Sequence, residues 1–242
     1  MAVLVTRPHP DNETTAAALR ARGYDVVLAP SLHLEPMPLP PDAAADYGAV
    51  IVTSANALRA VAPQLQDHPL LKLRLFAVGE QTAAAARRAG FVEVISADGD
   101  AAALCDCVVR NVGAGPPGAS PLLYLAGVDV SRDLAGELGT RGIEVVTRTT
   151  YRMVPIARLP RDICDAFAAN RIEAILHYST RSARVFLEAA RAAGVEISAL
   201  AVRQCCISAS VAQVLREAGA ARLAVAASPN EAALLTALAG TS

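Results

Sequence analysis

The chain has 242 residues, of which 53% are hydrophobic, and a formal net charge of −1 from 22 Lys and Arg against 23 Asp and Glu. This length and composition predict a folded globular protein with apolar side chains enough for one large domain or two smaller ones. The balanced charge excludes a global basic field for nucleic acid and an acidic tail, and aromatic residues at 4% with no Trp argue against base-stacking platforms.

Short apolar runs alternate with helical patterns along the chain. In the first half, VLVT at 3–6 precedes a helix predicted over 11–22, which ends at Gly23, and AVIVT at 49–53 leads into a helix from Ala55. The strands expected in this half lie at 3–6, 25–30, 49–53, 74–79 and 92–96. Strict alternation of strand and helix predicts an α/β protein with parallel sheets.

The second half repeats the first in the same order. Adding 119 to the residue numbers places LLYLAG over VLVTRP, and adding 125 places Ser179 over Ser54. Adding 129 places Ser208 over Gly79 and CCISASVAQVLREAG over FAVGEQTAAAARRAG. Three aligned segments in one order predict an internal duplication of about 120 residues.

Proline-rich stretches interrupt this pattern. The stretches at 28–42 and 151–160 both follow a strand-helix-strand unit, and we predict that they are extended connectors. A third stretch, VGAGPPGAS at 112–120, joins the halves and matches G-x-G-x-x-G. Because it follows a helix and carries two prolines where a new helix would begin, it does not fit a dinucleotide site.

The sequence lacks the usual catalytic constellations, with no GxxxxGK[ST], HExxH or GxSxG motif. The cysteines form no CxxC pair and have no His at metal-ligand spacing, so we expect reduced structural thiols and no metal site. The first residues, MAVLVTRPHP, carry no charged leader region, and no eighteen apolar residues run together. We therefore expect a soluble, cytoplasmic protein that does not bind a membrane.

Polar side chains stand where the predicted strands end and the next helices begin. In open parallel sheets ligands bind at this edge, where helix N-termini direct N–H groups and a partial positive charge outward. Such an edge suits a ligand with several carboxylates or phosphates, although Ser, Thr and Asn are also common helix N-caps. The junctions are Thr6-Arg7-Pro8, Thr53-Ser54-Ala55-Asn56, Gly79-Glu80-Gln81-Thr82, Gly127, Tyr178-Ser179-Thr180-Arg181 and Ser208-Ala209-Ser210.

The ordered set of motifs resembles the uroporphyrinogen-III synthase family. VLVTRP, VTSANAL, AVGEQTAAAARRAGF, LLYLAG, RGIEVV, TYR at 150–152, YSTRSA, ISASVAQVLREAG and SPNEAALLTAL follow in the family's order over nearly the whole chain. The resemblance implies a cofactor-independent, cyclising hydro-lyase of tetrapyrrole biosynthesis, on the routes to haem, sirohaem and cobalamin. Its substrate would be hydroxymethylbilane, an octa-carboxylate linear tetrapyrrole handed over from hydroxymethylbilane synthase, and the protein would be a monomer.

The family fold implies two α/β lobes joined by a two-stranded connector, with a discontinuous first lobe. Mapped onto this chain, lobe one comprises 1–34 and 153–242, and lobe two comprises 38–148. The connector strands would be 35–37 and 149–152. Both copies of the repeat would then contribute to holding one substrate.

The resemblance also implies roles for individual residues. Tyr151 matches the family tyrosine that follows the second lobe, and we expect it to donate a hydrogen bond to the departing hydroxyl group, with a modest effect on rate. Ser208 departs from its glycine repeat partner, and Arg132 and Arg152 are further candidates for pairing with carboxylates. The expected substrate-binding residues are Arg7, Thr53, Ser54, Asn56, Gly79, Thr82, Gly127, Tyr178, Ser179, Thr180, Arg181, Ser208 and Ser210.

Two other classes of function fit a lobed α/β pattern. A two-lobed small-molecule sensor without catalysis would resemble periplasmic binding proteins, which are normally exported. A flavodoxin-like cofactor binder would need aromatic residues around a flavin, and the strand-to-helix turns offer only Tyr178.

Overall fold

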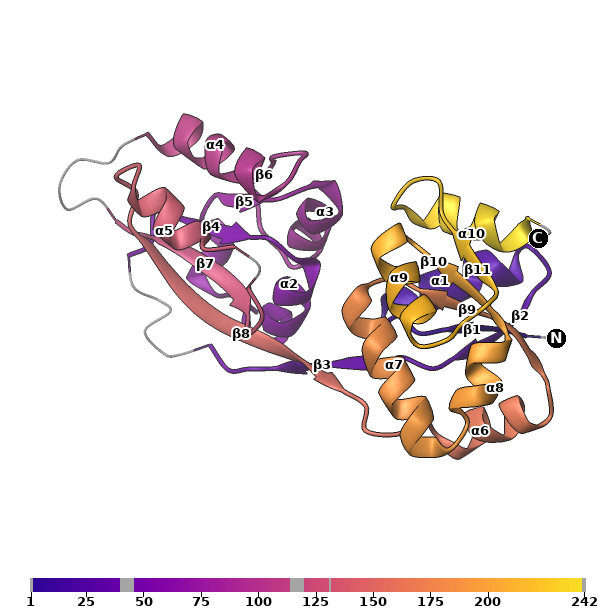
Figure 1. Cartoon of the computed structure of the whole chain (residues 1–242). Helices are drawn as coiled ribbons and strands as arrows, with labels where there is room; N and C mark the ends of the chain where they lie inside the picture. The colour runs from indigo at the N-terminus through magenta and orange to yellow at the C-terminus, as the bar shows by residue number, and fades with distance from the viewer. Residues whose placement is uncertain (1, 40–45, 114–119, 131, 241–242) are drawn as a thin grey trace. The chain divides into compact units, whose positions relative to one another are not determined.

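The computed structural model describes residues 2–39, 46–113, 120–130 and 132–240 (Figure 1). The chain divides into two compact units. Unit 1 comprises Met1–His33 and Val154–Ser242, and unit 2 comprises Leu34–Met153. Within the described parts, no helix is long and apolar enough to cross a membrane.

Unit 1 is built on a five-stranded sheet in the order β11-β10-β9-β1-β2, in which every neighbouring pair is parallel. The strands are β1 (Ala2–Val5), β2 (Asp25–Leu28), β9 (Ile172–His177), β10 (Arg203–Cys206) and β11 (Leu223–Val225). The helices are α1 (Asp11–Arg20), α6 (Arg161–Ala168), α7 (Thr180–Ala193), α8 (Glu196–Ala201), α9 (Ala209–Glu217) and α10 (Glu231–Ala239).

Both faces of this sheet are buried. Because successive side chains of a strand point to opposite faces, Val3 and Val5 of β1 pack in one cluster with Leu234 of α10, and Leu4 packs in another with Phe186 of α7. Helices therefore cover the sheet on both sides, as parallel sheets require. This explains why the strands read as continuous apolar runs.

Unit 2 is built on a six-stranded sheet in the order β3-β8-β7-β4-β5-β6. The strands are β3 (Leu32–Pro36), β4 (Ala49–Val52), β5 (Leu75–Ala77), β6 (Val94–Ser96), β7 (Leu122–Gly127) and β8 (Val145–Pro155). The helices are α2 (Ala55–Val61), α3 (Glu80–Arg88), α4 (Ala101–Val112) and α5 (Leu134–Gly139), with short 3-10 turns η2 (Ala62–Gln64) and η3 (Pro69–Lys72).

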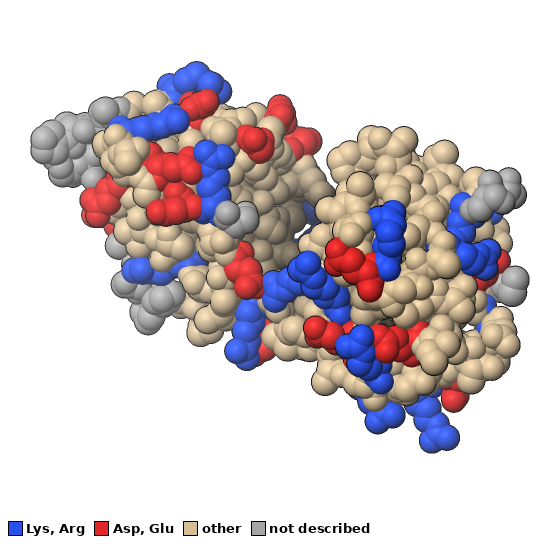
Figure 2. Space-filling view, in the orientation of Figure 1, with Lys and Arg blue, Asp and Glu red and all other residues tan. Residues whose placement is uncertain are grey.

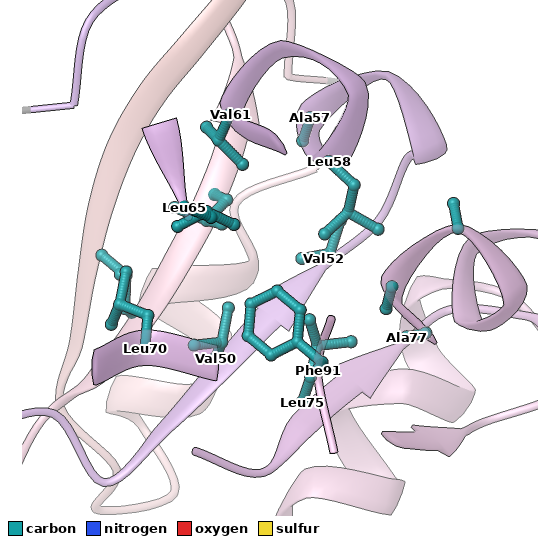
Figure 3. Packing of buried hydrophobic residues seen from close by; sticks show 14 of the residues in the cluster. Val50, Val52, Ala57, Leu58, Val61, Leu65, Leu70, Leu75, Ala77 and Phe91 are labelled. Atoms are coloured by element: carbon teal, nitrogen blue, oxygen red, sulfur yellow. The ribbon is translucent and has the colours of Figure 1, made fainter. Parts of the chain in front are cut away.

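The strands from β8 to β6 are parallel, whereas β3 runs antiparallel to β8. The antiparallel direction follows from two hydrogen bonds, in which Ile156 N–H donates to Ser31 O and Met37 N–H donates to Thr150 O. On one face of the sheet, Val50 and Val52 pack with Leu58 of α2, as Figure 3 shows. The opposite face packs against α4 and α5.

The two sheets place corresponding strands in the same order. The repeat predicted from the sequence pairs β1 with β7, β9 with β4 and β10 with β5. With these pairs, β2-β1-β9-β10-β11 of unit 1 follows the same course as β8-β7-β4-β5-β6 of unit 2. The predicted α/β fold with two mainly parallel sheets is confirmed.

Local boundaries differ from the prediction in a few places. The helix predicted over 11–22 ends at Arg20, and the chain turns through Gly23, whose φ of +82° favours glycine. The proline-rich stretches contain β3 and the end of β8, which are paired strands of the unit 2 sheet. In the 112–120 stretch Gly113 follows α4, while the other two glycines of the G-x-G-x-x-G match lie outside the described residues.

Candidate functional site

Four helices begin directly after strands, at N-cap residues with extended backbone. Their φ values are −146° at Ser54, −163° at Gly79, −158° at Ser179 and −155° at Ser208. Any residue adopts this conformation, and a Cβ added at Gly79 would meet no atom within 4 Å. Ser208 therefore occupies the position of its glycine repeat partner without backbone strain.

The four N-caps differ in how they satisfy the first turn of the helix. Ser54 Oγ accepts a hydrogen bond of 3.2 Å from Asn56 N–H, and Ser179 Oγ accepts one of 3.0 Å from Ser182 N–H. Gly79 and Ser208 provide no side-chain cap. Since helix N-termini have N–H groups without intrahelical partners, the starts of α3 and α9 suit an acceptor atom of a ligand.

Replacing Ser179 with alanine is expected to lower the free energy of unfolding by about 1 kcal/mol, because the cap of α7 is lost. Ser208→Ala in the same unit is the matched control, since Ser208 makes no cap hydrogen bond. Urea denaturation followed by circular dichroism compares the two variants. Equal losses in both would contradict the assigned cap.

A pocket of about 220 Å³ lies at the carboxyl edge of the unit 2 sheet. It brings together Thr53, Ser54, Gly127 and Tyr151, which were predicted for the site, and Arg132, a further candidate for pairing with carboxylates. The remaining lining residues are Ala101, Tyr124, Asp129, Val130 and Leu134. A second pocket, of about 340 Å³, shares Tyr124, Val130, Arg132 and Leu134 with the first, so the two adjoin.

Tyr151 reaches the pocket because the pairing of β7 with β8 is irregular there. The register shifts between Ala126 and Gly127, which places Gly127 opposite Tyr151, and Val128 N–H donates to Tyr151 O at 2.9 Å. A Cβ on Gly127 would lie 2.7 Å from Tyr151 Cζ and 2.9 Å from its Oη. The phenol ring therefore takes the space that any other residue at position 127 would fill, in the manner of bulges that redirect a side chain.

Tyr124 was not predicted for the site, yet it borders both pockets. Its side chain is buried, with 4% of the residue exposed, and its Oη lies 2.9 Å from Thr53 Oγ1. Burial raises the pKa of Tyr124. Inside the apolar run LLYLAG the sequence indicates only a core residue. The one available signal was that the repeat has Val5 at the corresponding position, so that Tyr124 carries a hydroxyl where its repeat partner has none.

Three expected substrate-binding residues of unit 2, namely Asn56, Gly79 and Thr82, are not among those that line either pocket. Asn56 Oδ1 accepts a hydrogen bond of 2.8 Å from Arg59, and its Nδ2 contacts Met153 Sδ at 3.9 Å. Thr82 is 6% exposed, and its N–H donates to Gly79 O. Asn56 and Thr82 thus support the helix starts from within the unit.

In unit 1, Arg7 takes part in a network of polar contacts. Its guanidinium lies 4.9 Å from the centre of the Tyr178 ring and pairs with Asp11 at 3.5 Å and Glu231 at 3.2 Å. The Tyr178 hydroxyl donates to Thr15 at 3.4 Å, and burial raises the pKa of Tyr178 to about 12. A ligand carboxylate at Arg7 would have to replace one of these carboxylate partners.

The other predicted residues of unit 1 lie at two helix starts. Thr180 and Arg181 are partly buried in the first turn of α7, next to the exposed Ser179. Ser208 Oγ and Ser210 Oγ lie 2.9 Å apart at the start of α9. These residues therefore surround the carboxyl ends of β9 and β10.

Several charged side chains pair with one another, including two arginines that the sequence suggested for the site. Arg132 forms two hydrogen bonds with Glu137, and Arg152 forms two with Glu35. On the face shown in Figure 2, basic and acidic side chains stand next to one another. Within the described ranges, no group of three or more His, Cys, Asp and Glu is placed to hold a metal ion, and the five cysteines are free thiols.

Comparisons with known proteins identify a family and a fold. The sequence matches the family model described as HEM4, uroporphyrinogen-III synthase HemD, over residues 13–236. It matches no curated protein. Uroporphyrinogen-III synthetase from Helicobacter pylori 26695 has a TM-score of 0.64 at 18% identity, covering 98% of this chain and 97% of that chain. A mutant uroporphyrinogen III synthase from the extremely thermophilic bacterium Thermus thermophilus has a TM-score of 0.54 at 19% identity, covering 99% and 98%.

Proposed function

Because the chain belongs to the uroporphyrinogen-III synthase HemD family, we propose that it cyclises hydroxymethylbilane to uroporphyrinogen III, with loss of water and inversion of ring D. The observation that carries this proposal is the family match over residues 13–236. The pocket of unit 2, in which hydroxyl groups surround Tyr151, supports it.

The proposed reaction makes three demands. The hydroxyl of the hydroxymethyl group on ring A takes up a proton from solvent and leaves as water, and its methylene carbon stays on ring A as part of an azafulvene cation. The substituted carbon of ring D then forms a bond to this methylene carbon, which gives a spiro intermediate. This intermediate fragments and recloses with ring D inverted. Because the free bilane closes to the uninverted isomer in solution, the main task of the protein is to hold the conformation that favours attack at the hindered carbon.

Tyr151 is suited to assist the first step. Phenols donate hydrogen bonds at neutral pH without being strong acids, so Tyr151 would donate to the hydroxyl group as it departs. Thr53 and Ser54 offer hydroxyl groups in the same pocket. The chain's own residues thus supply a polar lining for the reacting end of the bilane.

We also propose how the chain holds the acetate and propionate side chains. Helix N-termini attract carboxylates through N–H groups and a partial positive charge. The residues that we assign to this binding are Arg7, Thr53, Ser54, Asn56, Gly79, Thr82, Gly127, Tyr178, Ser179, Thr180, Arg181, Ser208 and Ser210. In this proposal the protein acts without a cofactor, as a cytoplasmic monomer that receives the bilane from hydroxymethylbilane synthase.

The decisive experiment uses purified protein and enzymatically generated hydroxymethylbilane. The products are oxidised, and the isomers are separated. We expect isomer III in excess over the buffer control. If isomer I alone accumulates, at the rate of the buffer control, the proposed function is rejected.

Replacing Tyr151 with phenylalanine is expected to lower kcat about 10-fold, because the ring stays and only the donor is lost. Tyr24→Phe is the control, since Tyr24 is also partly buried but lies in unit 1, where it packs against the core. Steady-state kinetics and thermal unfolding compare both variants with the wild type. A wild-type kcat in Tyr151→Phe would remove Tyr151 from the mechanism.

A further inference from the structure

Tyr124 joins the core of unit 2 to the edge of its pocket. Its ring packs in the cluster that contains Leu104 of α4 and Leu134 of α5. Its hydroxyl reaches the carboxyl end of the neighbouring strand β4, where Oη lies 2.9 Å from Thr53 Oγ1. Both residues border the pocket that Tyr151 also lines.

The hydroxyl groups of Tyr124 and Thr53 carry two donor hydrogens, of which the hydrogen bond between them needs only one. Each hydroxyl carries one donor hydrogen, and a single hydrogen bond joins the two oxygens. Within the described ranges, neither hydroxyl has a second partner. One O–H of the pair therefore remains to donate to another acceptor.

The burial of the two side chains indicates which hydroxyl can donate to a group outside the pair. Tyr124 is 4% exposed, whereas Thr53 is partly exposed at the pocket edge. Either oxygen could donate in this contact, and the arrangement in which the Tyr124 hydroxyl donates to Thr53 Oγ1 is the one that leaves no buried O–H group without a partner. The Thr53 hydroxyl is then the group whose hydrogen is available in the pocket.

We propose that Tyr124 is a positioning residue, which holds the Thr53 hydroxyl so that it donates to a carboxylate oxygen of the substrate. The proposal rests on the proposed function, in which the substrate carries several carboxylates. A donor whose direction is held in advance loses less orientational freedom on binding, and hydrogen bonds in a chain strengthen one another. In this proposal Tyr124 acts through Thr53.

A double-mutant cycle tests this role, with Tyr124→Phe, Thr53→Val and the double variant. Thr53→Val is expected to raise KM about 10-fold, because a hydrogen bond to a charged group is lost. Tyr124→Phe is expected to raise KM about 5-fold with kcat changed less than about 2-fold, because the Thr53 hydroxyl is present but no longer held. The double variant should match Thr53→Val, since no hydroxyl is then left to position.

Two controls separate positioning from packing. Tyr47→Phe removes a hydroxyl from another buried tyrosine of unit 2, whose ring packs on the opposite face of the sheet, and it should leave KM unchanged. Thr53→Ser keeps a hydroxyl, so Tyr124→Phe should still raise KM in that background. A purely structural role of Tyr124 would change the melting temperature in both Thr53 backgrounds but not KM.

The outcomes for the two proposals are distinct. An active wild type whose KM is unchanged by Tyr124→Phe overturns the positioning role alone. The same conclusion follows if the KM effects of Tyr124→Phe and Thr53→Val multiply in the double variant. A wild type that forms no isomer III rejects the proposed function, and the positioning role falls with it.

Discussion

Replacing Gly127 with alanine is expected to lower kcat/KM about 100-fold while the protein remains folded. The added Cβ would lie 2.7 Å from Tyr151 Cζ and 3.0 Å from its Cε1, which is closer than such atoms approach in proteins. The phenol ring is the far end of a side chain, so it moves and the backbone does not. Gly127→Ala should lower kcat/KM more than Tyr151→Phe does. The displaced phenol ring would both lose its position and occupy space in a pocket of about 220 Å³.

The matched control is Gly139→Ala in the same unit, where the same added atom meets nothing within 4 Å. Its kcat/KM should stay close to that of the wild type, because Gly139 is the last residue of α5 and lines neither pocket. Initial rates of isomer III formation and melting temperatures are measured for both variants. Activity of Gly127→Ala within about 3-fold of the wild type would contradict the assigned contact.

A second background tests whether the effect passes through the Tyr151 ring. In Tyr151→Ala the ring is absent, so the added methyl group at position 127 has nothing to displace. Gly127→Ala should then cause little further loss of kcat/KM. An equal loss in both backgrounds would show that Gly127 matters for another reason, such as the close approach of its backbone to the substrate.

The starts of the helices were predictable from the sequence, because a polar residue directly after a buried strand carries two signals at once. The apolar run predicts where the strand ends, and a serine at its end predicts an N-cap. Ser54 and Ser179 are N-caps with side-chain hydrogen bonds, in agreement with this pattern. The pairing of such junctions by the repeat also predicted which strands correspond in the two sheets.

The contacts around these junctions were not predictable, because they join residues far apart in the chain. Arg7 meets Glu231 only because α10 packs beside β1 in the folded unit. Tyr124 differs for another reason. The apolar run of its own strand, β7, indicates only burial, whereas its hydroxyl contacts Thr53, just after the end of the neighbouring strand β4. Sequence patterns report which face of an element is buried, whereas hydrogen bonds at its ends depend on which neighbours the fold supplies.

Acidification is expected to destabilise unit 1 through His177, the last residue of β9. Its imidazole is fully buried, and its Nε2 lies 2.9 Å from Gln204 Oε1. Gln204 Nε2 donates to Ala199 O and Val202 O, so its Oε1 faces the ring and accepts the Nε2–H. Within the described residues Nδ1 has no partner, and a proton added there would place a charge in an apolar site.

The sign of the effect follows from the direction of the pKa shift. Burial lowers the pKa of His177 from 6.5 to about 4, and the hydrogen bond with Gln204 opposes this only in part. Above pH 6.5 the imidazole is neutral in both the folded and the unfolded chain, so it causes no pH dependence. Between 6.5 and about 4 the unfolded chain binds a proton that the folded chain does not, and the free energy of unfolding falls by about 3 kcal/mol over this range.

Urea denaturation at about pH 7.5 and about pH 4.5 measures this loss, which should be about 2.5 kcal/mol smaller in His177→Gln than in the wild type. Glutamine keeps an N–H donor for Gln204 Oε1 but does not titrate, so it removes the proton uptake without removing the hydrogen bond. His33→Gln is the control for the exchange of an imidazole for an amide, because His33 is exposed. If wild type and His177→Gln lose the same free energy of unfolding, the buried imidazole is not the group through which acid acts on unit 1.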